Sequence, residues 1–174
     1  LVLRALWLRG HVKRALILAP KSVLRQWQEE LYEKFALNVP LYTGKDFVDY
    51  WGANLPPTTA NPWDGVRLAL ASSQLLKRRD RQSELLNAIP WDLVLVDEAH
   101  RYRNHTSQMF SALQRICKAP RRGEGLIEGK KKKVMLISAT PLNNRPQDLY
   151  YQLLLFQDAR RSTLPETNLQ NFFG

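Results

Sequence analysis

The sequence has a single cysteine, Cys117, among its 174 residues. An internal disulfide and a zinc site built on several cysteines are therefore excluded, and a lone thiol suits a reducing compartment such as the cytoplasm. Long apolar runs are also missing, since no segment approaches the roughly 18 residues of a membrane-spanning helix. Acidic residues are few, 16 Asp plus Glu against 26 Lys plus Arg, which leaves a formal net charge of +10. This balance favours a polyanionic partner such as nucleic acid, and a basic solvated surface is the plainer alternative.

The strongest local signal is the segment WDLVLVDEAH at residues 91–100. Its apolar, β-branched run at 93–96 predicts a buried parallel strand, with Asp97 and Glu98 at the carboxyl end. Open α/β sheets bind their ligands at that edge. An Asp there can hold Mg²⁺, directly or through water, beside the phosphates of a nucleotide, and the next Glu can deprotonate an attacking water. The alternative is a strand that ends in a solvated acidic turn.

Helical and strand patterns alternate along the rest of the chain, which predicts an α/β fold with a parallel sheet. Residues 54–65 are expected to form a surface loop and residues 118–133 a basic, Gly-rich linker. Apolar runs predict strands at 14–20, 40–42, 66–71 and 134–137. Five helices are predicted. The first is at 1–10, and the second is capped by Ser22 and buries Leu24, Trp27, Leu31 and Phe35. A basic helix follows Gln74, the next helix is capped by Asn104 or Thr106 and buries Cys117, and the last begins at Asn144 and Gln147.

Polar side chains follow two more of the predicted strands. Ser72, Ser73 and Gln74 come after the strand at 66–71 and precede a basic helix. Hydroxyls and amides there can bond phosphate oxygens without reading bases, although capping of the helix by either serine explains the same spacing. Ser138 and Thr140 follow the strand at 134–137, so we expect them at the same sheet edge as the two carboxylates, where they can sense a bound phosphate.

Four segments together resemble the Swi/Snf-type DNA-dependent ATPases of helicase superfamily two. In order and spacing, ILAPKSVLRQWQEEL at 17–31, ALASSQLL at 69–76, LVLVDEAHRYRN at 93–104 and LISATPLNN at 136–144 are similar to motifs Ia, Ic, II and III of that family. The resemblance covers about nine-tenths of the chain. NNRPQDLYYQLLLF at 143–156 is similar to the helix that follows motif III in the bacterial type.

The resemblance implies a RecA-like first helicase lobe at 1–157, a parallel sheet sandwiched by helices, and a tail at 158–174 that leads to a second RecA-like lobe. It implies ATP and Mg²⁺ as ligands, double-stranded DNA as the partner contacted along its backbone, a cytoplasmic, nucleoid-associated protein, and no membrane contact. By position, Asp97 would organise Mg²⁺ through water, Glu98 would be the base for water, and His100 would link the nucleotide site to motif III. Ser138 and Thr140 would couple the two sites, and the DNA-backbone side would hold Pro20, Lys21, Ser22, Ser72, Ser73 and Gln74.

The sequence departs from the family where the phosphates should bind. No GxxxxGK[ST] segment occurs in the 174 residues, and a second lobe with its arginine finger is absent from them. We therefore expect a fragment whose parent hydrolyses ATP while the chain alone hardly does. In such lobes the motif III strand lies between the DEAH strand and the strand before the P-loop, so the strand at 134–137 is expected to have one uncovered side.

Two other classes of protein stay open on the sequence. A non-catalytic nucleic-acid-binding module would use the basic surface without ATP. A metal-dependent phosphohydrolase would use Asp97, His100 and His105 as ligands, but the sequence shows no motif for a fourth ligand.

Overall fold

The computed structural model describes residues 2–102, 104–119, 132–139, 146–165 and 168–173. These residues form a seven-stranded sheet in the order β4-β3-β2-β5-β1-β6-β7. The neighbours β2, β5, β1, β6 and β7 pair in parallel, whereas β3 and β4 extend one edge as an antiparallel hairpin. The strands are β1 (Ala15–Ala19), β2 (Leu41–Tyr42), β3 (Phe47–Val48), β4 (Asn54–Leu55), β5 (Leu68–Ser72), β6 (Leu93–Val96) and β7 (Lys133–Leu136).

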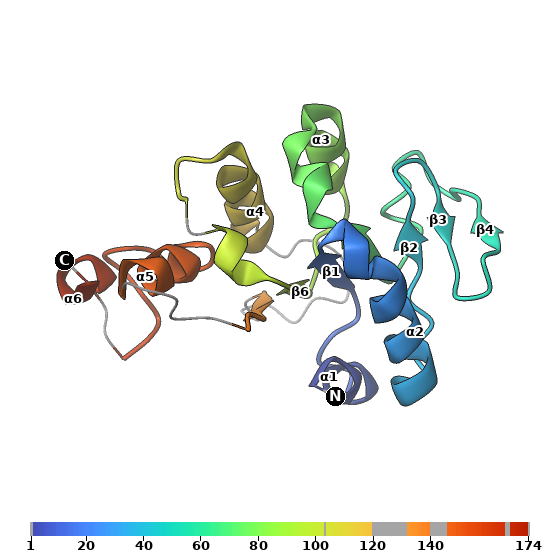
Figure 1. Cartoon of the computed structure of the whole chain (residues 1–174), viewed down its shortest axis with the longest axis horizontal. Coiled ribbons are helices and arrows are strands. Elements are labelled where there is room, and N and C mark those ends of the chain that lie inside the picture. Colours follow the sequence, from blue (N-terminus) through green and yellow to red (C-terminus); the bar gives the residue numbers. More distant parts are fainter. Residues whose placement is uncertain (1, 103, 120–131, 140–145, 166–167, 174) are drawn as a thin grey trace.

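Helices cover both faces of the sheet (Figure 1). Helices α1 (Val2–Leu8) and α2 (Leu24–Phe35) pack on one face, where their Leu3, Leu24 and Leu31 meet Ile17 and Leu95. The opposite face is covered by α3 (Arg79–Asn87), α4 (Gln108–Lys118) and residues next to α5 (Pro146–Leu154). The predicted α/β fold, a mainly parallel sheet between helices, is confirmed.

The two central strands carry the core. All five residues of β1 and all four of β6 are buried. Leu16 and Leu18 face the α3 and α4 side, and Ile17 faces the α1 and α2 side. A parallel strand covered on both faces has no solvated side, which is why these segments are continuous apolar runs without polar alternation.

Two predicted helix caps are wrong. Ser22 lies inside a 3₁₀ turn, η1 (Lys21–Val23), which forms because Val23 N donates to Pro20 O over 3.1 Å, and α2 begins after it without a side-chain cap. Helix α4 is capped by Ser107, whose Oγ accepts from Phe110 N at 3.1 Å. The predicted cap Asn104 instead accepts from the backbone and hydroxyl of Thr106 in a local turn. The third predicted opening, at Asn144, lies outside the described residues.

The expected surface loop at 54–65 is partly buried, which corrects that prediction. It begins in β4 and contains Trp63, whose side chain is fully buried. The Trp63 ring packs against Tyr42 at 4.5 Å, Phe47 at 5.2 Å and Trp91 at 6.3 Å between centroids. An aromatic cluster of this size anchors the hairpin edge to the central sheet, because rings bury large apolar areas.

Cys117 is confirmed as a core residue. It is buried in α4, and burial raises the pKa of its thiol to about 12, so the reactive thiolate is suppressed. Most of the predicted basic linker lies outside the described residues. Among the helices that the structure describes, none is long and apolar enough to cross a membrane.

The carboxyl-terminal segment folds back onto the lobe. After residue 157 the chain ends in a short helix, α6 (Leu169–Phe173), with Leu169 buried and the Phe173 ring 5.6 Å from that of Tyr150 in α5. Lys118 in α4 pairs with Asp158 at 3.1 Å. The boundary between lobe and tail at residue 157 stays a prediction.

Candidate functional site

The end of β6 turns sharply at the carboxyl edge of the sheet. Asp97 N donates to Leu18 O at 2.8 Å, and Ala99 N donates to Ile137 O at 2.9 Å, so the turn is fixed between the ends of β1 and β7. Glu98 between them has φ +53°, a left-handed backbone that a residue with a Cβ adopts only at a cost of about 1–3 kcal/mol. Its N–H donates to Asp97 Oδ1 at 2.9 Å. Two successive carboxylates, those of Asp97 and Glu98, therefore lie at the same strand end.

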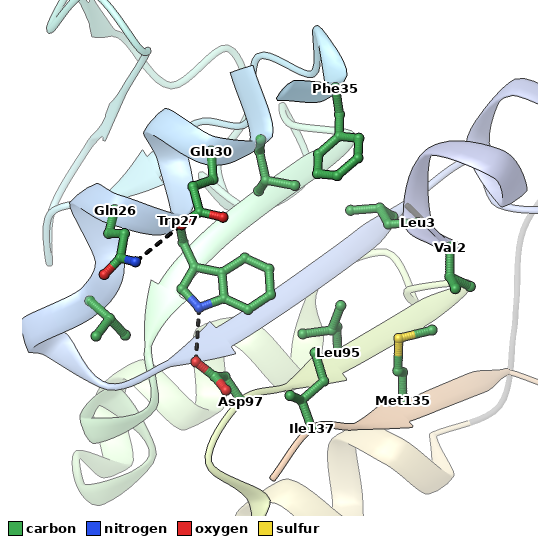
Figure 2. A pocket seen from close by; sticks show the side chains of 12 residues that line it. Val2, Leu3, Gln26, Trp27, Glu30, Phe35, Leu95, Asp97, Met135 and Ile137 are labelled. Carbon is green, nitrogen blue, oxygen red and sulfur yellow. Dashed lines mark hydrogen bonds between the residues drawn. The ribbon is translucent and has the colours of Figure 1, made fainter. Parts of the chain in front are cut away.

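Asp97 is held by two donors. The indole Nε1 of Trp27, in the first turn of α2, donates to Asp97 Oδ2 at 2.8 Å, as Figure 2 shows. The other oxygen accepts the Glu98 N–H. Each carboxylate oxygen has two acceptor positions, so both oxygens keep capacity for a further ligand.

Glu98, His100 and Ser138 form one cluster. His100 lies in a 3₁₀ turn, η3 (Ala99–Tyr102), and its Nδ1 is 3.0 Å from Glu98 Oε2 and 3.2 Å from Ser138 Oγ. Ser138 follows β7, so a single ring nitrogen connects the ends of two neighbouring strands. His100 thus contacts the segment after β7, and its predicted role, to link the nucleotide site to motif III, stays a prediction.

A pocket of about 490 Å³ opens next to Asp97. Its floor is formed by Leu95, Met135 and Ile137 from the ends of β6 and β7, and its walls by α1 and α2 (Figure 2). The walls are Val2, Leu3, Val23, Gln26, Trp27, Glu30, Leu31 and Phe35. The polar side chains in this mainly apolar lining are Gln26, Glu30 and Asp97.

The donors present fit a weakly held Mg²⁺ and not a transition metal. The described residues contain no group of three His, Cys, Asp or Glu that could surround an ion. Mg²⁺ is typically bound by one or two carboxylates, with waters and phosphate oxygens completing the octahedron. Asp97 can supply that carboxylate, with Glu98 beside it. The given 174 residues contain no GxxxxGK[ST] segment.

The metal-dependent phosphohydrolase hypothesis finds no support in the described part of the chain. His105, its third ligand, is exposed and stacks on the ring of Tyr151 with 4.4 Å between centroids. That contact belongs to the α5 side of the molecule. His100 is engaged with Glu98 and Ser138 instead of a third ligand.

The residues predicted to face DNA come from two adjacent strand ends. Ala19 of β1 and Ser72 of β5 are partners in the parallel register, so the segments that follow them lie side by side. Lys21, Ser22 and Gln74 are exposed there.

The remaining predicted contacts at these strand ends are less available. Ser72 is half-buried and its Oγ caps η2 (Ser73–Lys77) by accepting from Gln74 N at 3.2 Å, which confirms the capping alternative for this serine. Pro20 and Ser73 are buried. Thr140 lies outside the described residues.

Sequence reasoning placed Trp27 on the buried face of its helix but missed its role at the site. A signal was available, since a buried indole N–H needs an acceptor, and α2 begins directly after the strand next to β6.

Gln28 was missed entirely. Its side chain, on the same helix, is buried and donates to Val39 O at 3.1 Å and Val48 O at 3.2 Å, which fixes α2 to the hairpin side of the sheet.

Solved structures with this fold include the Sulfolobus solfataricus SWI2/SNF2 ATPase core in complex with dsDNA. It matches with a TM-score of 0.61 at 19% identity, over 88% of this chain and 27% of that one. The helicase domain of Pyrococcus furiosus Hef matches with a TM-score of 0.55 at 17% identity, over 89% of this chain and 30% of that one. At these identities the likeness establishes the fold.

Relatives in sequence include bacterial proteins. The uncharacterized ATP-dependent helicase YqhH of Bacillus subtilis (strain 168) is 28% identical over 86% of this chain and 22% of its own length. The RNA polymerase-associated protein RapA of Pseudomonas aeruginosa (strain LESB58) is 29% identical over 92% of this chain and 15% of its own length. The chain thus spans less than a quarter of these curated relatives. The model of the SNF2-related domain matches residues 7–164. The chain belongs to the SNF2-related domain family of helicase superfamily two.

Proposed function

We propose that the chain is the first ATPase lobe of a motor that couples ATP hydrolysis to movement along double-stranded DNA. One observation carries the proposal: Asp97, Glu98, His100 and Ser138 meet at the carboxyl edge of the sheet. The exposed Lys21 lies on the neighbouring strand end. A nucleotide site and a phosphate-binding surface can therefore share one edge of one sheet, which is the location that open α/β sheets use for ligands.

The carboxylates of Asp97 and Glu98 have different roles in the proposed reaction. Bound Mg²⁺–ATP would supply the γ-phosphoryl group that water attacks. Asp97 would hold the ion, through water, because both of its oxygens keep an acceptor position after accepting the Trp27 and Glu98 N–H groups. Glu98 accepts the proton of the attacking water. The left-handed backbone at Glu98 supports this role, since strain of that kind clusters at functional sites.

His100 couples the carboxylates to the end of β7. Its Nδ1 is within 3.2 Å of both Glu98 Oε2 and Ser138 Oγ, so a shift of the segment after β7 changes the position of Glu98. We propose Ser138 and Thr140 as the pair of hydroxyls through which this segment senses the nucleotide and communicates with the second lobe.

The DNA surface is assigned to Lys21, Ser22 and Gln74, with Ser72 behind them. Exposed ammonium, hydroxyl and amide groups can contact phosphates, and such contacts do not distinguish one base sequence from another. Pro20 and Ser73 are buried, so their role is to shape the two loops and not to contact phosphates. The presence of dsDNA in the related Sulfolobus solfataricus core supports this choice of partner.

Hydrolysis is proposed to need residues beyond the 174. The phosphate cradle of the family and an arginine finger from a second lobe do not occur among them, and a finger alone contributes roughly 10³–10⁵ in rate in related phosphoryl transfers. The second candidate function is a DNA-binding module that never hydrolyses ATP. It would be favoured if the full-length protein also lacked a phosphate cradle, and it predicts that DNA binding is indifferent to ATP.

The test is Glu98→Gln in the full-length protein, with Glu33→Gln on the exposed face of α2 as the matched control. Loss of the base is expected to lower ATP hydrolysis by about 10²–10⁴-fold. Nucleotide affinity should stay within about threefold, because the amide keeps the shape of the side chain. Near-normal turnover by Glu98→Gln would refute the assignment, and absence of hydrolysis in the unmutated full-length protein would favour the binding module.

A further inference from the structure

Trp27 occupies the position between the two halves of the proposed site. It lies on the first turn of α2, half-buried, and its ring forms a wall of the pocket beside Leu95 and Ile137 (Figure 2). Its Nε1 reaches Asp97 Oδ2 at 2.8 Å, a short bond of the kind formed between a donor and a charged acceptor. An indole N–H donates and cannot accept, so Trp27 cannot itself be a ligand of an ion.

The bond determines which way the Asp97 carboxylate faces. With Oδ1 held by Glu98 N at 2.9 Å and Oδ2 held by Trp27, rotation of the carboxylate plane breaks at least one hydrogen bond. If the indole donor is lost, Oδ2 becomes free to rotate about the remaining contact. Groups that orient a ligand in this way typically change metal affinity by about 10–100-fold when they are removed.

The segment just before α2 is the loop assigned to DNA. Helix α2 follows η1 directly, and η1 carries the exposed Lys21 and Ser22. Trp27 lies in the first turn of α2, four residues after Val23, the last residue of η1. A displacement of the start of α2 by a DNA phosphate therefore moves the indole relative to the end of β6.

We propose that Trp27 is a positioning residue that ties the orientation of the Asp97 carboxylate, and so the binding of Mg²⁺ with nucleotide, to the DNA-facing loop at the start of α2. The inference rests on the proposed function, because it takes Asp97 as the group that organises Mg²⁺. It adds a residue and a physical route by which duplex DNA changes the nucleotide site: the route runs through one hydrogen bond and needs no movement of the sheet.

The test is Trp27→Phe in the full-length protein, measured by calorimetric titration of ADP at several Mg²⁺ concentrations and in EDTA. The Mg²⁺ concentration that gives half of the Mg²⁺-dependent gain in ADP affinity should rise by about tenfold. ADP affinity in EDTA should not change, because the lost bond orients only Asp97. Duplex DNA should shift the Mg²⁺ requirement of the unmutated protein and leave that of Trp27→Phe unchanged. Trp51→Phe, at a residue of the β3–β4 hairpin that is 65% exposed, is the matched control.

A double-mutant cycle with Asp97→Asn separates positioning from packing. If Trp27 acts through Asp97, its replacement adds no further change to the Mg²⁺ requirement in the Asp97→Asn background. An equal loss of ADP affinity with and without Mg²⁺, or an unchanged Mg²⁺ requirement, would overturn the inference. Should Trp27→Phe fail to fold by circular dichroism, Trp27→Met, a long apolar side chain without a hydrogen-bond donor, is measured under the same criteria.

The two proposals fail in different ways. An unmutated full-length protein that binds ADP without any Mg²⁺ dependence, or does not bind it, refutes the proposed function itself. An unmutated protein that behaves as expected beside a Trp27→Phe variant indistinguishable from it refutes only the role of Trp27.

Discussion

Asp92→Ala should destabilise the lobe more than most substitutions of an acidic residue. The Asp92 side chain is buried at the start of β6, and its Oδ2 accepts from Lys13 N at 2.7 Å and Arg14 N at 3.0 Å. Its own backbone donates to Arg14 O at 2.9 Å and accepts from Lys133 N at 2.8 Å. One residue thus aligns the starts of β1, β6 and β7, the three strands whose far ends carry the candidate site.

The magnitude follows from those two bonds. A hydrogen bond to a charged group contributes about 1.5–3 kcal/mol, and a buried donor left without an acceptor loses a similar amount. Water reaches part of this region once the side chain is truncated, so we expect Asp92→Ala to lower the free energy of unfolding by about 3–5 kcal/mol. Asp92→Asn keeps one carbonyl oxygen for the two amides but loses the charge and turns the other oxygen into an NH₂ donor, for which we expect a loss of about 1–2 kcal/mol.

Urea denaturation followed by circular dichroism measures both variants. Asp158→Ala is the control, since the side chain of Asp158 is 72% exposed and its surface pair with Lys118 should contribute less than about 1 kcal/mol. The denaturant slope should not change, because the same surface is exposed on unfolding. An Asp92→Ala variant as stable as Asp158→Ala would refute the alignment argument, and equal losses for Ala and Asn would show that charge, not the paired acceptance, dominates.

Two further outcomes are expected. The affinity for duplex DNA should be insensitive to sequence and should fall steeply as the salt concentration rises. Lys21→Ala should reduce the slope of log affinity against log salt concentration by about 1, whereas the control Lys34→Ala, at the far end of α2, should leave that slope unchanged. High affinity retained in concentrated salt would contradict the prediction. The isolated 174 residues should self-associate in light scattering through β7, which is the last strand of the described sheet and leaves Ile137 36% exposed. Met135→Lys should reduce the association, and a monodisperse unmutated chain would contradict it.

Much of the fold could be predicted because buried parallel strands have a strong local signature. The runs at β1 and β6 are apolar for their whole length, and β5 is apolar up to its last residue, Ser72. The bounds of β6 are those predicted, and the bounds of β1 and β5 differ from the predicted ones by one or two residues. The placement of Asp97 and Glu98 followed from the same signal, since polar residues directly after such a strand must emerge at its carboxyl edge. Local pattern is sufficient wherever burial on both faces dictates it.

The sequence was a poor guide where partners lie far apart along the chain. The Trp27 and Asp97 side chains that share a hydrogen bond are 70 residues apart, and Asp92 is 78 residues from Arg14. Trp63 was assigned to a loop because Pro and Gly surround it, yet it is fully buried. Local turn signals in that segment describe the backbone correctly and do not report that a single aromatic side chain points back into the core.

The sheet order explains why one hydrogen bond can connect two functions. Along the carboxyl edge, the ends of β5 and β1 carry the residues assigned to DNA, and the ends of β6 and β7 carry those assigned to the nucleotide. The boundary between the two sets falls between β1 and β6, neighbours that lie about 4.8 Å apart in any sheet. Helix α2 starts on the β1 side of that boundary, and Trp27 reaches across it to Asp97. On the proposed route, a contact made at Lys21 would be transmitted through η1 and the first turn of α2, over six residues, while β1 and β6, buried on both faces, stay fixed.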